Sequence, residues 1–479
     1  MRTSLSCAAS CSVFQRLEGI GTVNNVMQSV SDKEKTIHIA MALNNSFTEL
    51  TCVSMASVLA NTKWGCCFHV LFNSLTDENQ KLLSSLCERF SHGTWKFYHV
   101  DNIYNEKLIL DEGMRLSTEA YYRLFLSDVL EDIDKVLYLD CDTIAEDDLS
   151  KIWNIDLCGQ LAAVAKRAST QHVGIRDRKQ ILGLDIESNY FNSGVILFNL
   201  AKIREEDVFA NVYEVISLVF NKFADKLDRF PWAADQDVLN YLLKNRTINI
   251  SPKYNHISVA YNLIDNDEAS LEEWAECYKS PCIRHFVGID KPTIIKRNVL
   301  KSSLDWERFY YYKSLTPISN VAEDDARIAR YNKYLDNWRN GHIENRNTYF
   351  YYNQIPALID LASQITSIIV EKKLAIWGLS ASLRTLMALL AGNGVYPALI
   401  VDGLEKNHGV AIFGDSRFVV QSSKCLEGKA SEYIVLLAMQ DEQSVRDVSE
   451  ILTSYGYSLS SIVPIYRAIY DSLREEILP

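Results

Sequence analysis

Two aspartates two positions apart, Asp140 and Asp142, carry the strongest chemical signal in the sequence. They follow an uninterrupted apolar run, Val136–Leu139, which is typical of a strand buried on both faces, although a short buried helix gives the same pattern. Side chains two apart on a strand point to the same side, so both carboxylates would converge. Because close carboxylates repel each other, a divalent cation between them is expected, with Mg²⁺ or Mn²⁺ favoured when phosphate oxygens complete the shell. The spacing alone is also compatible with a solvated turn, since it recurs at Asp132–Asp134, Asp235–Asp237 and Asp265–Asp267.

Alternating strands and helices surround this pair and would position it. Strands are predicted at Ile37–Leu43, Cys67–Asn73, Trp95–Val100, Val136–Leu139, Leu161–Ala165, Tyr190–Leu200 and Pro281–Gly288. Helices are predicted at Phe47–Ala60, Asp77–Phe90, Glu119–Leu130, Asp207–Phe223 and Trp232–Leu243. This alternation is typical of βαβ units and predicts an α/β fold with a parallel sheet, in which ligands bind at the carboxyl ends of the strands.

Composition indicates a globular chain of more than one domain. Of the 479 residues, 48% are hydrophobic and 23% are charged, which allows a sizeable core. The formal net charge of −12 argues against nucleic-acid binding. No apolar run reaches the length of a transmembrane helix. The 11 cysteines form no metal-finger pattern, and the apolar surroundings of Cys66 and Cys67 predict buried thiols in a reducing cytoplasm.

Four segments are expected along the chain. Residues 1–35 are small, polar and poorly periodic, which predicts a disordered leader rather than a signal peptide. Residues 36–295 would form the α/β domain that carries the aspartate pair, and residues 296–371 a helical linker rich in charged and aromatic side chains. Residues 372–479 repeat a strand–helix–strand pattern and predict a smaller Rossmann-like α/β domain.

Within the carboxyl-terminal segment, further strands are predicted at Ile412–Phe413 and Tyr433–Ala438, followed by a helix at Glu442–Ser454. Its glycine-rich phosphate loop is degenerate, because only Gly378 remains of the usual glycines. We therefore expect a structural, regulatory or docking role for this domain in preference to cofactor binding.

Four motifs, in this order along the chain, resemble those of glycosyltransferase family 8, the retaining nucleotide-sugar enzymes that include lipopolysaccharide galactosyl- and glucosyltransferases. They are KVLYLDCDTI, YFNSGVILFNL, DQDVLN and HFVGIDKP, within a resemblance that covers Thr36–Pro292. The resemblance implies a GT-A-type nucleotide-sugar-binding domain with a mixed, mostly parallel sheet. It also implies transfer of a hexose from UDP-glucose or UDP-galactose with retention of configuration.

By position in these motifs, Asp140, Asp142 and His285 would bind one divalent ion that bridges the two phosphates of the donor. A fixed cation stabilises the charge that develops on the diphosphate as the sugar leaves. An imidazole ligand favours Mn²⁺, with Mg²⁺ as the other candidate. The alternative for His285 is a strand-end histidine held by a backbone hydrogen bond.

The resemblance assigns donor or substrate binding to six more residues, namely Asn44, Arg123, Asn192, Asp235, Gly288 and Lys291. Gln236 and Asp237 would be catalytic, with Gln236 near the anomeric carbon. A carboxamide is a poor nucleophile, so we favour same-face attack with electrostatic support from Gln236 over a covalent glycosyl intermediate. The simpler alternatives are a turn residue for Asn192, a helix-surface salt bridge for Arg123 and a solvated side chain for Lys291.

Two departures from the family pattern concern the donor. Asn44 and Asn45 stand where members commonly place an aspartate against the uridine, and an amide can still bond to a base edge. Lys166 stands where many members carry an acidic sugar contact, which leaves the identity of the sugar open.

The resemblance implies an acceptor that is a glycan, a lipid-linked molecule or a protein, in a surface-polysaccharide pathway. We expect a cytoplasmic protein, with peripheral attachment to the inner face of the membrane as an alternative. Two other functions compete with glycosyl transfer. A sugar nucleotidyltransferase shares a similar sheet and metal, but it usually opens with a glycine-rich basic loop that IHIAMALNNSF lacks. A non-catalytic sugar-nucleotide-binding scaffold is the third hypothesis.

Overall fold

The structure of the chain is a computed structural model. It describes residues 16–17, 35–100, 108, 117–167, 175–185, 188–224, 233–257, 264, 267–287, 291–292, 303–320, 324, 326, 329, 354–369, 371–380, 382–439 and 442–465. The predicted leader lies outside the described residues except for positions 16, 17 and 35, and so do much of the predicted linker and Gly288.

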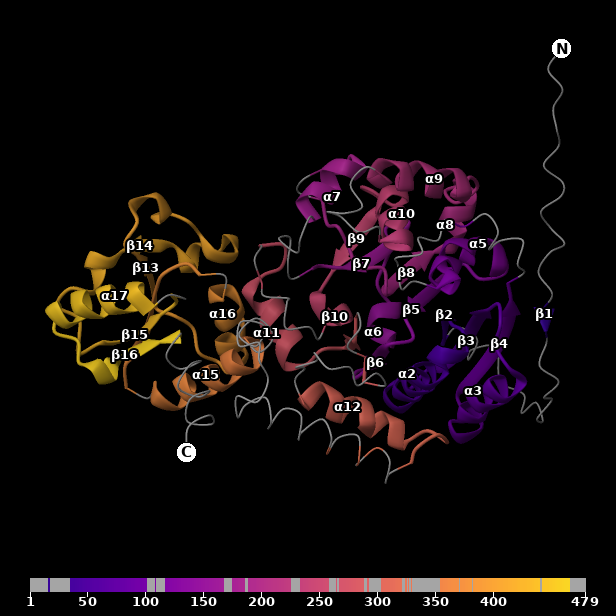
Figure 1. The fold of residues 1–479 in the computed structure, drawn as a ribbon, viewed down its shortest axis with the longest axis horizontal. Helices are drawn as coiled ribbons and strands as arrows, with labels where there is room; N and C mark the ends of the chain where they lie inside the picture. Colours follow the sequence, from indigo (N-terminus) through magenta and orange to yellow (C-terminus); the bar gives the residue numbers. More distant parts are fainter. Residues whose placement is uncertain are drawn as a thin grey trace, which may run out of the picture.

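An eight-stranded mixed sheet forms the centre of the larger lobe (Figure 1). Its strands, in spatial order, are β1 (Arg16–Leu17), β4 (Gly93–His99), β3 (Gly65–Phe72), β2 (Thr36–Ala42), β5 (Lys135–Leu139), β8 (Val195–Asn199), β7 (Ala162–Ala165) and β9 (Thr247–Ile250). Strands β4, β3, β2 and β5 are parallel, whereas β8 runs antiparallel to both of its neighbours. The mixed, mostly parallel sheet expected for a GT-A-type fold is therefore present.

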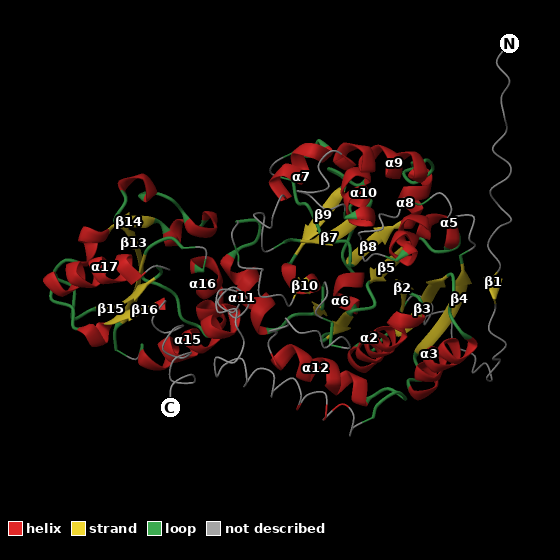
Figure 2. Cartoon of the chain, in the orientation of Figure 1, coloured by secondary structure: helices red, strands yellow, loops and turns green. Residues whose placement is uncertain are grey.

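Helices pack on both faces of this sheet (Figure 2). They are α2 (Thr48–Asn61), α3 (Asp77–Arg89), α5 (Leu126–Val129), α6 (Ser150–Trp153), α7 (Ile175–Leu182), α8 (Leu200–Glu205), α9 (Val212–Phe223) and α10 (Ala234–Leu242), with α11 (Leu271–Lys279) and α12 (Ser303–Ser314) farther along the chain. Alternate side chains of β5 enter different cores: Leu137 lies in the cluster beneath α2, and Tyr138 lies in the cluster beneath α9 and α10. The prediction that this apolar run is a strand buried on both faces is confirmed.

A small three-stranded sheet brings a distant segment to the end of β5. It consists of β10 (His256–Ile257), β11 (Ile283–His285) and β6 (Thr143–Ala145), and β11 runs antiparallel to β6. His285, the last residue of β11, is paired with Thr143, the residue directly after Asp142. The antiparallel pairing therefore places His285 beside the aspartate turn.

Several predicted elements are shorter than expected or differ in type. The strand predicted over Tyr190–Leu200 begins only at Val195, because the Asn192 side chain accepts a hydrogen bond from the Gly194 amide and forms a turn. Residues Thr118–Phe125 form a 3₁₀ helix, η2, followed by the short α5, where one α-helix was predicted. The helix predicted from Asp207 begins at Val212, since Asp207 has a left-handed backbone with a φ of 50°.

The carboxyl-terminal lobe is built on a separate sheet of five parallel strands (Figure 1). In spatial order they are β14 (Val420–Ser422), β13 (Leu399–Asp402), β12 (Lys373–Trp377), β15 (Tyr433–Leu437) and β16 (Ile462–Pro464), accompanied by the helices α15 (Gln354–Ile368), α16 (Leu383–Gly392) and α17 (Glu442–Ser454). This order is the one found in doubly wound nucleotide-binding sheets, which supports the Rossmann-like prediction. The strand predicted at Ile412–Phe413 is wrong: this stretch is a 3₁₀ turn in which Phe413 has a φ of 58°.

Helix α11 joins the two lobes. Its Leu271 and Trp274 side chains share one apolar cluster with residues of α15 and α16, including Leu386. Around this cluster, Arg384 forms an ion pair with Asp267 at 2.9 Å, and the backbone amide of Phe413 donates to the same carboxylate. Burial of apolar surface supplies most of the stability of such an interface, and the polar contacts fix its register.

The nine described cysteines are all free thiols, and Cys66 and Cys67 are buried as predicted. Among the described residues, no helix has both the length and the apolar character needed to cross a bilayer.

Candidate metal centre

The turn after β5 and the end of β11 bring three metal-ligating side chains together. One ligand atom each of Asp140, Asp142 and His285 lies within 4.8 Å of the others. His285 Nε2 is 3.6 Å from Asp140 Oδ2 and 3.2 Å from Asp142 Oδ1. Asp142 and His285 are buried, so their mutual approach is set by the fold. Two carboxylate oxygens and an imidazole nitrogen form a donor set that suits a divalent cation.

Asn255 fixes the orientation of the His285 ring. Its Oδ1 lies 2.9 Å from His285 Nδ1, and an amide oxygen can only accept, so Nδ1 donates its proton to Asn255. The other ring nitrogen, Nε2, is thereby directed at the two carboxylates. A second residue that holds the far side of a ligating imidazole in this way is typical of metal sites, and it increases the basicity of the ligand.

Gly194 leaves room for the three ligands. A Cβ atom at this position would lie 2.1 Å from His285 Cε1 and 2.6 Å from Asp140 Oδ2. Any side chain at residue 194 would therefore occupy the space in which the ligands meet. The φ of Gly194 is not in the left-handed region, so its backbone conformation does not require glycine. The space needed by the ligands does.

Arg123 holds one oxygen of Asp140 away from this space. Its guanidinium donates to Asp140 Oδ1 at 2.8 Å and to the Ser193 carbonyl at 2.7 Å, and its Nε lies 3.2 Å from Asp235 Oδ2. The Tyr138 hydroxyl also donates to Asp140 Oδ1, which leaves Oδ2 facing His285. Because Arg123 is buried, the alternative of a helix-surface salt bridge is wrong.

Lys291 forms an ion pair with Asp142 Oδ2 and lies over the Phe47 ring. Burial opposes ionisation of Asp142, but the charges of Lys291 and His285 outweigh it and lower the pKa of this carboxyl below its ordinary value. Lys291 is thus not the solvated side chain of the simpler alternative. Its ammonium group is placed at the rim of the three-ligand cluster.

A row of amide side chains extends from His285 into the protein. Asn255 Nδ2 donates to Asn192 Oδ1 at 2.9 Å, and Asn192 Nδ2 donates to Gln236 Oε1 at 3.1 Å. Gln236 Nε2 then donates to the Tyr190 hydroxyl at 3.1 Å. All of these bonds point the same way, so each amide is held in one orientation.

The row ends at Asp237, which is fully buried. The Tyr190 hydroxyl donates to Asp237 Oδ1 at 2.6 Å, and Arg178 donates to Oδ2 at 2.7 Å. Burial raises the pKa of Asp237, and the Arg178 charge opposes this shift. The carboxylate therefore terminates the row behind Gln236, on the side away from the metal ligands.

Asp235 precedes Gln236 in α10 and has other partners, since Ser193 Oγ donates to it at 2.9 Å. Burial raises the pKa of Asp235 to about 6, although the Arg123 guanidinium acts in the opposite direction. The two aspartates that flank Gln236 are therefore paired with different arginines: Asp235 with Arg123, and Asp237 with Arg178.

Asn44 and Lys166, the two positions that depart from the family pattern, have partners of their own within the protein. Asn44 follows β2, and its amide nitrogen donates to Glu119 Oε2 at 3.2 Å while its oxygen caps the next turn. Lys166 donates to both carboxylate oxygens of Glu273, at 2.9 Å each, so it is tied to α11.

Several residues of this arrangement were not among the predicted site residues, and they include Tyr190, Gly194, Asn255 and Arg178. Tyr190 and Gly194 lie inside the motif that contains Asn192, so their proximity to the site was readable. Asn255 and Arg178 had no signal, because nothing local to them marks a position opposite His285 or Asp237.

Comparison with known proteins is consistent with this geometry. Residues 38–292, just over half of the chain, match the family model for glycosyl transferase family 8. General stress protein A of Bacillus subtilis is 24% identical over 267 residues, which is 54% of this chain and 88% of that protein. A lipopolysaccharide 1,2-glucosyltransferase of Escherichia coli is 24% identical over 294 residues, which is 60% of this chain and 81% of that protein. The fold also matches a crystal structure of the galactosyltransferase LgtC with donor and acceptor sugar analogues, at 23% identity and a TM-score of 0.51, over 61% of this chain and all of that chain.

Proposed function

Because the chain belongs to glycosyl transferase family 8, we propose that this glycosyltransferase moves a hexose from a UDP-sugar to an acceptor, with retention and with a divalent metal at Asp140, Asp142 and His285. The observation that carries the proposal is the convergence of these three ligands beside the amide row of Asn192 and Gln236. The similarity to a lipopolysaccharide 1,2-glucosyltransferase supports a hexose such as glucose or galactose as the transferred group.

Mn²⁺ fits the donor set better than Mg²⁺, because an imidazole accompanies the two carboxylates. A bound ion would supply positive charge where the diphosphate leaves the sugar. The chain's own contribution is to hold the ligands in place. Arg123 and Tyr138 retain one oxygen of Asp140, and Asn255 retains Nδ1 of His285.

Lys291 would contact the diphosphate oxygens. Its ammonium group already lies beside Asp142, so a phosphate oxygen at the same rim would compete with that carboxylate for it. We propose that Gly288, which lies outside the described residues, would let the backbone come close to the same diphosphate. Asn44, at the end of β2, would bond to the uridine, and Arg123 would position Asp140 and Asp235.

Gln236 and Asn192 would face the donor sugar. Gln236 Oε1 already accepts from Asn192 Nδ2 and, at 3.4 Å, from the Ser193 amide, so its lone pairs are engaged. This engagement supports same-face attack over a covalent intermediate on Gln236. Asp237 would hold Gln236 in place through Tyr190, and Asp235 would complete the wall of the sugar pocket.

The acceptor would be a glycan, a lipid-linked molecule or a protein, handled at the cytoplasmic side of a membrane in surface-polysaccharide synthesis. Membership of the family favours glycosyl transfer over nucleotidyl transfer and over a scaffold role.

A donor-hydrolysis assay with a panel of UDP-sugars, with and without Mn²⁺, tests the proposal. We expect release of UDP that requires Mn²⁺ and falls by at least about 100-fold in Asp142→Asn, because an altered ligand displaces the charge from the leaving group. The matched control is Asp134→Asn, in the exposed Asp132–Asp134 triplet, where no loss is expected. Hydrolysis that persists in the presence of a chelator would contradict the metal-dependent mechanism. In a parallel reaction supplied with UTP and a hexose 1-phosphate, release of pyrophosphate would indicate nucleotidyl transfer.

A further inference from the structure

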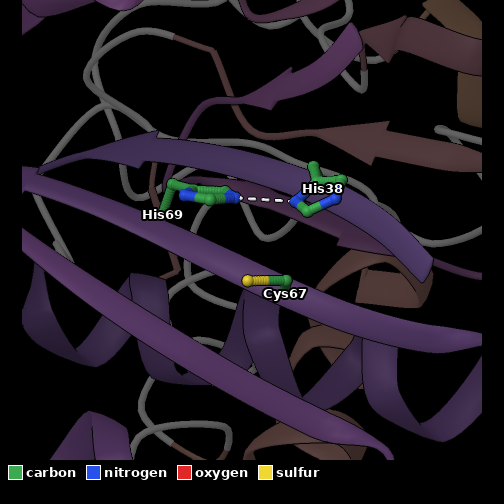
Figure 3. Close-up of side chains that lie close together, drawn as sticks. All are labelled: His38, Cys67 and His69. Carbon is green, nitrogen blue, oxygen red and sulfur yellow. Dashed lines mark hydrogen bonds between the residues drawn. The ribbon is translucent and has the colours of Figure 1, made fainter. Parts of the chain in front are cut away.

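A second group of metal-ligating side chains lies on β2 and β3, at a distance along the strands from the candidate metal centre. His38 of β2 is paired with Cys67 of β3, and His69 follows two positions later. All three side chains project from the same face of the sheet, because paired residues of parallel strands and residues two apart share a face. Figure 3 shows the two rings side by side and Cys67 on the neighbouring stretch of strand.

The ligand atoms of this group are close enough to share one ion. One nitrogen of each histidine and the Cys67 sulfur all lie within 4.8 Å of one another. His38 Nδ1 and His69 Nε2 are 2.9 Å apart and form a hydrogen bond, so these two nitrogens face each other, and an ion would take the place of the proton between them. His69 and Cys67 are buried and His38 is half-buried, which leaves His38 on the accessible side.

Tyr98 completes the arrangement from β4. Its hydroxyl lies 2.9 Å from His69 Nδ1, the ring nitrogen that faces away from His38. When His69 Nδ1 donates to this hydroxyl, Nε2 keeps its lone pair for a metal. A partner on the outer nitrogen of a ligating histidine is the arrangement expected around metal sites.

Two residues of β4, Lys96 and Thr94, influence the pKa values of this group. Lys96, paired with His69 from β4, adds positive charge and, after burial, is the second cause that lowers the pKa of His38. Burial raises the pKa of the Cys67 thiol, while a hydrogen bond with Thr94 and the Lys96 charge oppose that shift. Independently of these shifts, a sulfur ligand beside two imidazole nitrogens favours soft and borderline metals over hard cations.

We propose that His38, Cys67 and His69 form a zinc site that is separate from the Asp140–Asp142–His285 centre. Two imidazoles and a thiolate are ligands that Zn²⁺ prefers, whereas Mn²⁺ and Mg²⁺ prefer oxygen. Binding forms a metal–sulfur bond and releases the thiol proton to solvent. Both rings stay neutral, with their remaining protons on the outer nitrogens. Three protein ligands leave a fourth position for water, and the ion would link β2 to β3.

Cobalt is the probe that separates this site from the first one, because thiolate-to-Co²⁺ charge transfer gives a near-ultraviolet absorption that oxygen and imidazole ligands do not give. The full-length protein is titrated with Co²⁺ under reducing conditions. We expect the thiolate absorption to saturate at one equivalent, to disappear on addition of Zn²⁺, and to persist in excess Mn²⁺.

The variants test the assignment. Cys67→Ser should abolish the absorption, and His38→Gln should weaken the binding, while both retain the parent's circular dichroism. Cys66→Ser is the matched control, because Cys66 is the adjacent buried thiol and lies in the cluster on the opposite face of the sheet. We expect its Co²⁺ spectrum to equal the parent's. The proposal fails if the parent gives no thiolate absorption at saturating Co²⁺, or if the absorption survives in Cys67→Ser. Failure here would leave the Mn²⁺-dependent activity, and hence the proposed function, untouched.

Discussion

Replacing Gly194 with alanine should disable the Asp140–Asp142–His285 centre with little effect on the rest of the fold. The added Cβ would lie 2.1 Å from His285 Cε1, and real Cβ atoms essentially never come closer than 3.0 Å to another heavy atom. The ring, the backbone or both must therefore move by at least 0.9 Å, the difference between these distances. Because the φ of Gly194 is not left-handed, alanine introduces no backbone strain of its own.

A displacement of about 1 Å is large for a metal site, where ligand distances hold to within about 0.2 Å. Misplacement of this size costs about 100-fold in function, so we expect the dissociation constant for Mn²⁺ to rise by at least about 100-fold. This corresponds to a loss of about 2.7 kcal/mol of binding free energy. Overpacking should lower the free energy of unfolding of the metal-free protein by about 1–3 kcal/mol.

Isothermal titration calorimetry with Mn²⁺ in the presence of UDP measures the first quantity, and urea unfolding without metal measures the second. Gly403→Ala is the matched control, because a Cβ there meets nothing within 4 Å and the φ of this glycine is also not left-handed. We expect the control to bind Mn²⁺ as the parent does. If Gly194→Ala binds Mn²⁺ with the parent's affinity, the three side chains do not hold the ion and the reasoning is refuted.

Two further predictions follow from the surroundings of the site. Asn255→Ala removes the acceptor of His285 Nδ1, so the Mn²⁺ dissociation constant measured by calorimetry should rise by about 10- to 100-fold, while Asn249→Ala, at an exposed amide, should leave it unchanged. The second prediction concerns His256, whose pKa is lowered to about 3 by burial and by the charge of Arg284. Its contribution to stability is present above pH 6.5 and is lost as the pH falls from 6.5 towards 3, because the unfolded histidine takes up a proton that the folded one excludes. For this half-buried ring the loss should be on the order of 2 kcal/mol, and His256→Gln should flatten that part of the urea-unfolding profile. Parallel pH profiles of parent and variant would contradict it.

The local sequence pattern was sufficient to predict the strand that precedes Asp140 and Asp142. The apolar run before Asp140 is typical of a strand with a core on each side, and β5 is such a strand. The pattern gave the wrong boundary where a side chain shortens an element. The Tyr190–Leu200 stretch reads as one apolar strand, but the Asn192 side chain captures the Gly194 amide and delays the strand to Val195.

The candidate site could be predicted only in part from the sequence, because several of its contacts join segments far apart in the chain. Asn255 is 30 residues from His285, and their contact depends on the parallel pairing of β10 with β11. Nothing in the composition around either residue encodes that pairing. Arg123 was marked by its motif position, but its burial between Asp140 and Asp235 follows only from the packing of η2 against the sheet.

Helix α11 also determines how this protein can be dissected. Its apolar side, with Leu271 and Trp274, is covered by α16, while its first turn anchors Lys166 through Glu273. A recombinant fragment that stops at residue 295 would retain α11 and lose its cover, and exposed apolar surface of that kind favours aggregation. Attempts to isolate the amino-terminal lobe should therefore include polar substitutions on this helix, or supply residues 354–465 as a separate polypeptide.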